Sequence, residues 1–130
     1  MYLFTYGTLR MNAAHPMADK IAKNAHLVGL GFIKNAKLFQ IDWYPALFKS
    51  EDESDIVIGD VYRLDNLDFL AELDAYENIG IGKPPYEYRR EREKVYFEEE
   101  MEGLDCFIYF YNWPLPDRAT LIESGDFLNP

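Results

Sequence analysis

The order of apolar and polar positions along the chain predicts many strands. Residues 2–6 are almost continuously apolar, which is typical of a buried strand. Later apolar runs are interrupted by glycine or asparagine, as at bulges and tight turns. The predicted strands span residues 2–6, 26–34, 36–41, 56–64, 88–97 and 104–111, the last two forming a hairpin with a turn through residues 101–103. Residues 43–47 contain Pro45, which predicts an edge strand or an ordered crossing there.

Two segments follow a helical spacing instead. Between residues 15 and 24 the pattern is helical, and Met17, Ile21 and Ala25 share one face. A second helix is expected from a cap at Asp65 or Asn66 to about residue 78.

This set of elements predicts an α+β domain. Strands outnumber the two main helices and do not alternate with them, which favours a strongly curved sheet or small mixed β-barrel flanked by the helices over a doubly wound parallel sheet. A chain of 130 residues has the length of one domain, so residues 1–130 are expected to fold around a single core.

One acidic residue of the second helix falls on its apolar side. Leu70, Leu73 and Glu77 are three and then four positions apart, so they lie along one stripe. If the stripe stays buried, desolvation raises the pKa of Glu77 toward the range of a general acid or base. If the helix ends there, Glu77 is simply in water.

The segment Tyr6-Gly7-Thr8-Leu9, directly after the first strand, also has two interpretations. Gly7 is compatible with an ordinary turn that needs a positive φ. Alternatively, the N–H groups of Gly7, Thr8 and Leu9 point to one place and bind an anion, with glycine letting a ligand approach the backbone closely.

Net charge and cysteine content argue against several classes of function. A net charge of -10 argues against nucleic-acid binding, which depends on clustered cations. The basic residues at 89–94 alternate with acids, as on a solvated strand face, and the acidic stretch 51–55 lacks the pattern of a calcium loop. Cys106, the one cysteine, lies in an apolar run and indicates an inert buried thiol in a reducing cytoplasm. The sequence shows neither a membrane-spanning run nor a signal peptide.

Six short motifs, in order and over nearly the whole chain, resemble the γ-glutamylcyclotransferase superfamily, most closely its γ-glutamylamine cyclotransferase-like branch. The motifs are Tyr6-Gly7-Thr8-Leu9, Tyr44-Pro45-Ala46-Leu47, Gly59-Asp60-Val61-Tyr62, Leu73-Asp74-Ala75-Tyr76-Glu77, Tyr88-Arg89-Arg90 and Cys106-Phe107-Ile108-Tyr109. One departure follows Arg10: residues 11–14 read Met-Asn-Ala-Ala, where family members often carry a basic segment with glycine.

The resemblance implies an enzyme without metal or cofactor. The α-amine of a γ-glutamyl compound attacks its own γ-carbonyl, and pyroglutamate and a free amine or amino acid are released. The resemblance places the catalytic glutamate at Glu77 and the substrate cavity along residues 6–9. Tyr88 and Tyr109 are candidate orienting hydroxyls, although both are equally compatible with core tyrosines.

Several alternatives stay open at this point. The leaving group could be an amine, an amino acid, a lysine isopeptide or an acyl-carrier thioester derivative, and the oligomeric state is not specified. The N–H groups of residues 7–9 could bind either the substrate carboxylate or the developing oxyanion. The alternative to an enzyme is a non-catalytic module that holds a small molecule or a partner in the same cavity.

Overall fold

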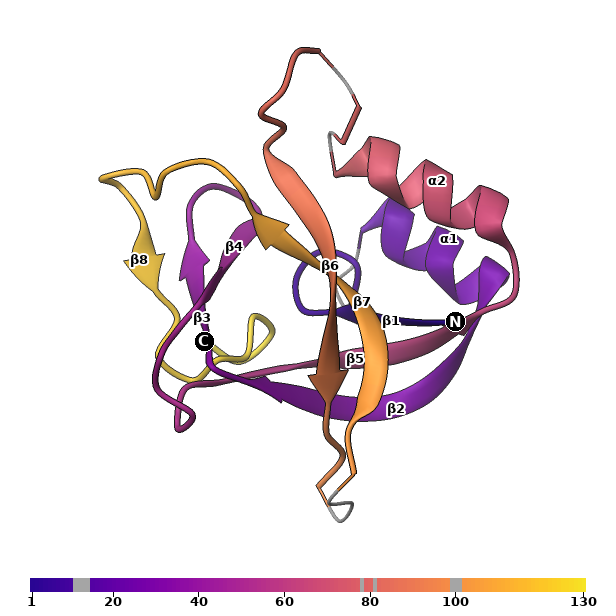
Figure 1. The fold of residues 1–130 in the computed structure, drawn as a ribbon, viewed down its shortest axis with the longest axis horizontal. Helices are drawn as coiled ribbons and strands as arrows, with labels where there is room; N and C mark the ends of the chain where they lie inside the picture. Colours follow the sequence, from indigo (N-terminus) through magenta and orange to yellow (C-terminus); the bar gives the residue numbers. More distant parts are fainter. Residues whose placement is uncertain (11–14, 78, 81, 99–101) are drawn as a thin grey trace.

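The computed structural model describes residues 1–10, 15–77, 79–80, 82–98 and 102–130. These residues form eight strands and two helices, which Figure 1 labels. In chain order they are β1 (Tyr2–Thr5), α1 (Pro16–Asn24), β2 (Ala25–Lys34), β3 (Ala36–Gln40), β4 (Pro45–Lys49), β5 (Ile56–Leu64), α2 (Leu67–Tyr76), β6 (Tyr88–Val95), β7 (Leu104–Tyr111) and β8 (Thr120–Leu121).

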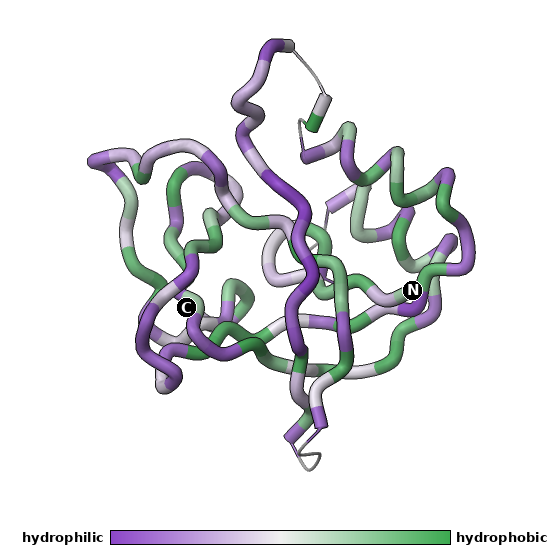
Figure 2. The backbone as a smooth tube through the Cα atoms, in the orientation of Figure 1, coloured by the Kyte–Doolittle hydropathy of each residue, from purple (hydrophilic) through white to green (hydrophobic). Residues whose placement is uncertain are grey.

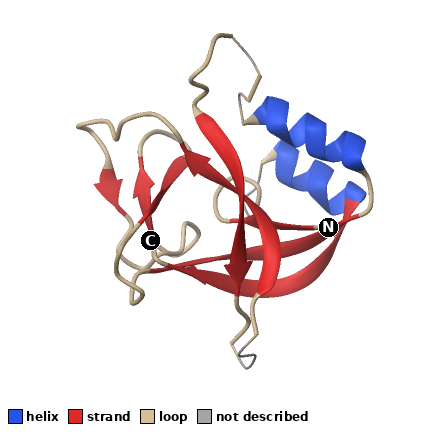
Figure 3. Cartoon of the chain, in the orientation of Figure 1, coloured by secondary structure: helices blue, strands red, loops and turns tan. Residues whose placement is uncertain are grey.

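The main sheet has five strands in the order β2-β5-β1-β7-β6 and is strongly curved (Figures 1 and 3). Its central strand β1 runs antiparallel to β5 and parallel to β7. The two edges meet at one point, where Phe32 and Tyr96 exchange two backbone hydrogen bonds of 2.9 Å. This single bridge does not close a barrel. The predicted α+β class with a curved sheet is therefore confirmed, in its open form.

The main sheet is covered on both faces, as the alternation of side chains along β1 shows. Leu3 packs in a cluster with residues of both helices, including Ile21 and Leu73. Phe4, the next residue, packs in a second cluster with Leu38 of the smaller sheet. That smaller sheet has the order β4-β3-β8. Figure 3 shows the helices and the smaller sheet on opposite sides of the large one.

The two helices begin at side-chain caps. At α1, His15 Nδ1 accepts a hydrogen bond from the N–H of Met17 at 3.1 Å, and Pro16 occupies the first turn, where its missing N–H costs nothing. At α2, Asn66 Oδ1 accepts from the N–H of Asp68 at 2.9 Å, as predicted. Helix α2 ends at Tyr76, and residue 78, its predicted end, lies outside the described residues.

The strand predictions are confirmed to within a few residues, with one omission. The proline-containing stretch forms β4, an edge strand with Pro45 as its first residue. Strand β8 was not predicted, because it has only two residues and pairs with β3 through two residue pairs. The predicted turn of the β6–β7 hairpin includes residue 101, which lies outside the described residues.

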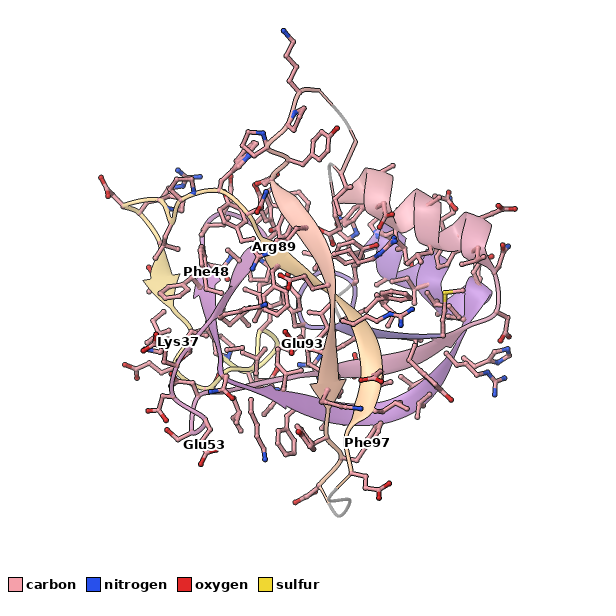
Figure 4. All side chains as sticks on the ribbon, viewed as in Figure 1. Lys37, Phe48, Glu53, Arg89, Glu93 and Phe97 are labelled. Atoms are coloured by element: carbon pink, nitrogen blue, oxygen red, sulfur yellow. The ribbon has the colours of Figure 1, made fainter. Side chains whose placement is uncertain are left out.

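The basic run forms the exposed face of β6, as predicted. Figure 2 shows this strand as a hydrophilic stretch, and Figure 4 shows Arg89 and Glu93 along it. Several of its charged side chains are paired with neighbouring strands: Glu91 lies 2.8 Å from Lys49 of β4, and Lys94 lies 2.9 Å from Asp105 of β7. Ion pairs with the neighbouring strands therefore neutralise part of this run.

The close packing of β5 on β1 predicts that Gly59→Ala is destabilising. A Cβ atom at this position would lie 2.1 Å from the backbone oxygen of Thr5 and 2.6 Å from Cζ of Phe4. Because backbone must shift, we expect a loss of at least about 2 kcal/mol in unfolding free energy, measured in urea. Gly103→Ala is the comparison: the three atoms nearest to its Cβ all belong to the Lys94 side chain, with Lys94 Cβ at 2.8 Å, and none is a backbone atom, so it should cost less than Gly59→Ala. Equal effects of the two substitutions would contradict this account of the packing.

Candidate active site

A cavity of about 290 Å³ opens where β1 ends. It lies between the last turn of α2, the start of β4 and the β6–β7 pair. Its lining consists of Phe4, Thr5, Tyr6, Gly7, Thr8, Leu9, Trp43, Tyr44, Pro45, Tyr76, Glu77, Glu87, Tyr88 and Tyr109. The structure thus brings every residue predicted for the site, together with Tyr109, to one cavity, although these residues come from four separate parts of the sequence.

Gly7 is needed here for a reason that the sequence did not indicate. Its φ lies outside the left-handed region, so the prediction of a positive-φ turn is wrong. A Cβ on Gly7 would lie 2.6 Å from Cγ and 2.8 Å from Cδ of Pro45. The glycine therefore lets the Pro45 ring pack directly on the loop after β1.

Arg10 fixes the end of this loop. Its N–H donates to the Gly7 carbonyl at 3.1 Å, and its guanidinium is buried between two carboxylates. Nε lies 3.3 Å from Oδ2 of Asp60 on β5, and Nη1 lies 2.5 Å from Oδ1 of Asp126 near the C-terminus. Burial opposes ionisation of Asp126, but Asn129 and the Arg10 guanidinium outweigh it and lower its pKa. The loop is thereby tied to two distant parts of the chain.

Glu77 is the C-terminal cap of α2. Its N–H donates to the Leu73 carbonyl at 3.0 Å, so its side chain continues the stripe of Leu70 and Leu73. The residue is partly exposed and lines the cavity. Burial, followed by the charges of Glu87 and Asp74, raises the pKa of Glu77 to about 8. The helix does end here, as in the second sequence interpretation, but Glu77 lines a cavity and is desolvated, as in the first.

The two neighbouring carboxylates are held by other side chains. Glu87 is buried and accepts a hydrogen bond from the Tyr44 hydroxyl at 2.7 Å. Asp74 accepts one from the Tyr109 hydroxyl at 2.6 Å and pairs with Arg90. Sequence reasoning missed Glu87, because it precedes β6 in an irregular segment where no periodicity marks a buried acid.

The candidate orienting hydroxyls of Tyr88 and Tyr109 both have structural partners, Tyr109 bonding Asp74, and so does the hydroxyl of Tyr6. Tyr88 donates to the Pro45 carbonyl at 2.8 Å, and Tyr6 donates to the Tyr109 carbonyl. Burial raises the pKa of both phenols, with Glu77 contributing to each. Both phenols therefore stay neutral, and each hydroxyl oxygen can still accept a hydrogen bond.

Neither a cysteine nucleophile nor a metal-binding cluster is found among the described residues. Cys106 is buried in β7, and burial raises its pKa to about 12, so the thiolate nucleophile does not form. Among the described residues, no three His, Cys, Asp or Glu side chains are grouped to hold a metal ion. In the same residues, neither helix is long and apolar enough to cross a membrane.

Comparison with known proteins agrees with this geometry. The family model described as gamma-glutamyl cyclotransferase, AIG2-like, matches residues 3–129. The chain therefore belongs to this family. No curated protein matches the chain.

Solved structures show where the cyclotransferase-like fold recurs. The solution structure of YtfP from Escherichia coli is 34% identical over 99% of this chain and 97% of that one, with a TM-score of 0.68. An AIG2-like protein from Mus musculus is 22% identical over 89% of this chain and 80% of that one, with a TM-score of 0.65. A structure named gamma-glutamyl cyclotransferase is 20% identical over 86% of this chain and 66% of that one, with a TM-score of 0.64. The last two likenesses establish the fold alone.

The buried ion pairs of Arg10 predict a large effect of Arg10→Met. The substitution keeps roughly the length of the side chain but removes the buried charge that contacts Asp60 and Asp126, and breaking such a pair typically costs about 3–5 kcal/mol in unfolding free energy. The control is Arg63→Met, because the Arg63–Asp65 pair is exposed and worth about 1 kcal/mol at most. Denaturation in urea measures both. An Arg10 variant as stable as the Arg63 variant would show that the ion pairs do not hold the loop.

Proposed function

We propose that the cavity binds a γ-glutamyl compound and converts it to pyroglutamate and a free amine or amino acid, with Glu77 as general acid and base. The observation that carries the proposal is the position of Glu77: a carboxyl of raised pKa faces the same cavity as the loop of residues 7–9. Family membership supports the same reaction class.

The reaction needs positioning and proton transfer. The α-nitrogen of the substrate forms a bond to its own γ-carbonyl carbon, and the bond from that carbon to the leaving nitrogen breaks. Nucleophile and electrophile belong to one molecule, so a cavity that folds the substrate into attack geometry supplies much of the rate enhancement. No group is transferred to the protein, and no redox step occurs.

Glu77 is suited to move the proton. The α-amine enters as an ammonium and must lose a proton before it attacks, while the leaving nitrogen must gain one. With a pKa of about 8, Glu77 is close to the optimum for both transfers at neutral pH. The bound ammonium is a positive charge beside the carboxyl, so it favours the ionised form of Glu77 in the complex.

The loop of residues 7–9 supplies the complementary donors in this proposal. Backbone N–H groups at Gly7, Thr8 and Leu9 bind the α-carboxylate of the substrate or the developing oxyanion. The net charge of -10 does not oppose this, because oriented donors act at contact distance, whereas surface charges are screened by salt. Tyr6 and Tyr88 line the same cavity.

Trp43 and Tyr44 line the cavity beside this loop, and we assign the leaving group to their side. The leaving group of the substrate is either an amine or an amino acid. Residues 11–14, where the sequence departs from the family pattern, lie outside the described residues. The buried thiol of Cys106 is compatible with a reducing compartment, so the proposal places the reaction in the cytoplasm.

Glu77→Gln tests the proposal, because the amide keeps the size of the side chain but cannot carry the proton. We expect turnover to fall at least about a hundredfold, while binding of the product 5-oxoproline survives. The wild type should gain activity as Glu77 ionises with rising pH, and the variant should lose this acid limb. Mass spectrometry of a panel of γ-glutamyl compounds measures pyroglutamate release.

Glu72→Gln is the matched control, since Glu72 is exposed on the same helix and pairs with Lys20 away from the cavity. It should leave turnover unchanged. A folded Glu77→Gln protein with wild-type turnover would remove Glu77 from the chemistry. A wild type that binds the panel but converts none of it would favour a non-catalytic binding module.

A further inference from the structure

Three side chains that the mechanism above does not use form a hydrogen-bonded row next to the cavity. Thr8 Oγ1 lies 3.0 Å from the Tyr76 hydroxyl, and this hydroxyl lies 3.3 Å from Nε2 of His15. The row joins the loop after β1 to the end of α2 and to the cap of α1. Thr8 and Tyr76 both line the cavity.

The helix cap sets the direction of this row. Because His15 Nδ1 accepts the N–H of Met17, that nitrogen carries no proton, and in the neutral ring the proton is on Nε2. Nε2–H then donates to the Tyr76 oxygen. The Tyr76 hydroxyl in turn donates to Thr8 Oγ1, and the Thr8 proton is left to point elsewhere.

Ring packing holds the His15 end of the row in place. The His15 ring stacks on Trp43, with centroids 5.6 Å apart and an interplanar angle of 4°. It meets the Tyr76 ring edge-on at 5.6 Å and 73°. Burial raises the pKa of Tyr76, so its hydroxyl keeps the proton that it donates.

We propose that His15 and Tyr76 orient the Thr8 hydroxyl so that it donates a hydrogen bond to an anionic oxygen of the γ-glutamyl substrate. His15 and Tyr76 are positioning residues, and Thr8 is the residue that touches the substrate. The inference rests on the proposed function. It adds one side-chain donor to the backbone donors of the same loop, with its proton direction fixed before the substrate arrives.

The anionic oxygen belongs either to the substrate α-carboxylate or to the oxyanion that forms during attack. The two sources differ in when the hydrogen bond is made. A bond to the carboxylate exists in the bound substrate and in the product 5-oxoproline, so its loss weakens binding. A bond made only to the oxyanion leaves binding unchanged and lowers kcat.

Thr8→Val is the first test, because valine matches the shape of threonine but has no donor. A hydrogen bond to a charged group is worth about 1.5–3 kcal/mol, so we expect about a 10- to 100-fold loss. Isothermal titration calorimetry measures the affinity for 5-oxoproline and for 2-pyrrolidinone, which lacks the carboxylate. The rate of pyroglutamate release at varied substrate concentration gives kcat and KM. Thr8→Ser keeps the hydroxyl and should retain wild-type values within a few fold.

Tyr76→Phe tests the row itself, because it removes one hydroxyl and keeps the ring. We expect a smaller loss than for Thr8→Val, and no further loss when both substitutions are combined, since Tyr76 acts only through Thr8. Tyr96→Phe is the control: Tyr96 lies outside the cavity, at the end of β6, and its hydroxyl should be dispensable. Nitrogen-15 NMR of the ring should find His15 protonated on Nε2.

The outcomes separate this inference from the proposed function. Weaker 5-oxoproline binding with unchanged 2-pyrrolidinone binding supports the carboxylate, and a loss confined to kcat supports the oxyanion. Thr8→Val with wild-type binding and turnover, Thr8→Ser as defective as Thr8→Val, or a His15 proton on Nδ1 would overturn the inference while Glu77 keeps its role. A wild type that neither binds 5-oxoproline nor converts any γ-glutamyl compound would overturn the proposed function and this inference together.

Discussion

The buried guanidinium of Arg10 is the interaction on which the arrangement of the cavity depends. It joins the loop after β1 to Asp60 on β5 and to Asp126 near the C-terminus, positions that are 50 and 116 residues away in the sequence. Gly7 completes the constraint by letting Pro45 pack against the same loop. Contacts at both ends of a short loop leave it little freedom, so its backbone is held in one arrangement beside the cavity.

The same packing also changes the electrostatic surroundings of Glu77. Once the loop, β4 and β6 enclose the cavity, the carboxyl of Glu77 loses water and faces the negative charges of Glu87 and Asp74. A carboxyl in this position destabilises the fold when it is ionised, because its pKa is higher in the folded chain than in the unfolded chain. The contribution of Glu77 to the free energy of unfolding is therefore most favourable at acidic pH, and it decreases as the pH rises toward about 8. Such a cost is common at sites where proton transfer is the function.

The sequence predicted what depends on local periodicity and missed what depends on distant contacts. The stripe through Leu73 and Glu77 is a property of one helix, so the acid that ends it could be recognised before the structure was known. The role of Gly7 could not, because the atoms that exclude a side chain belong to Pro45, 38 positions further along. Arg10 and Glu87 were missed for the same reason: each is buried by segments that only the folded chain brings together.

The central claim is that the fold turns Glu77 into a carboxylic acid with a pKa suited to proton transfer at neutral pH. Titration of the Glu77 side-chain carboxyl carbon by NMR measures this directly, with Glu72 as the exposed reference on the same helix. The account predicts a midpoint near pH 8 for Glu77, and a lower midpoint in Glu87→Gln, which removes the charge that acts on it most strongly. A Glu77 midpoint near 4.5, unchanged by Glu87→Gln, would contradict the account.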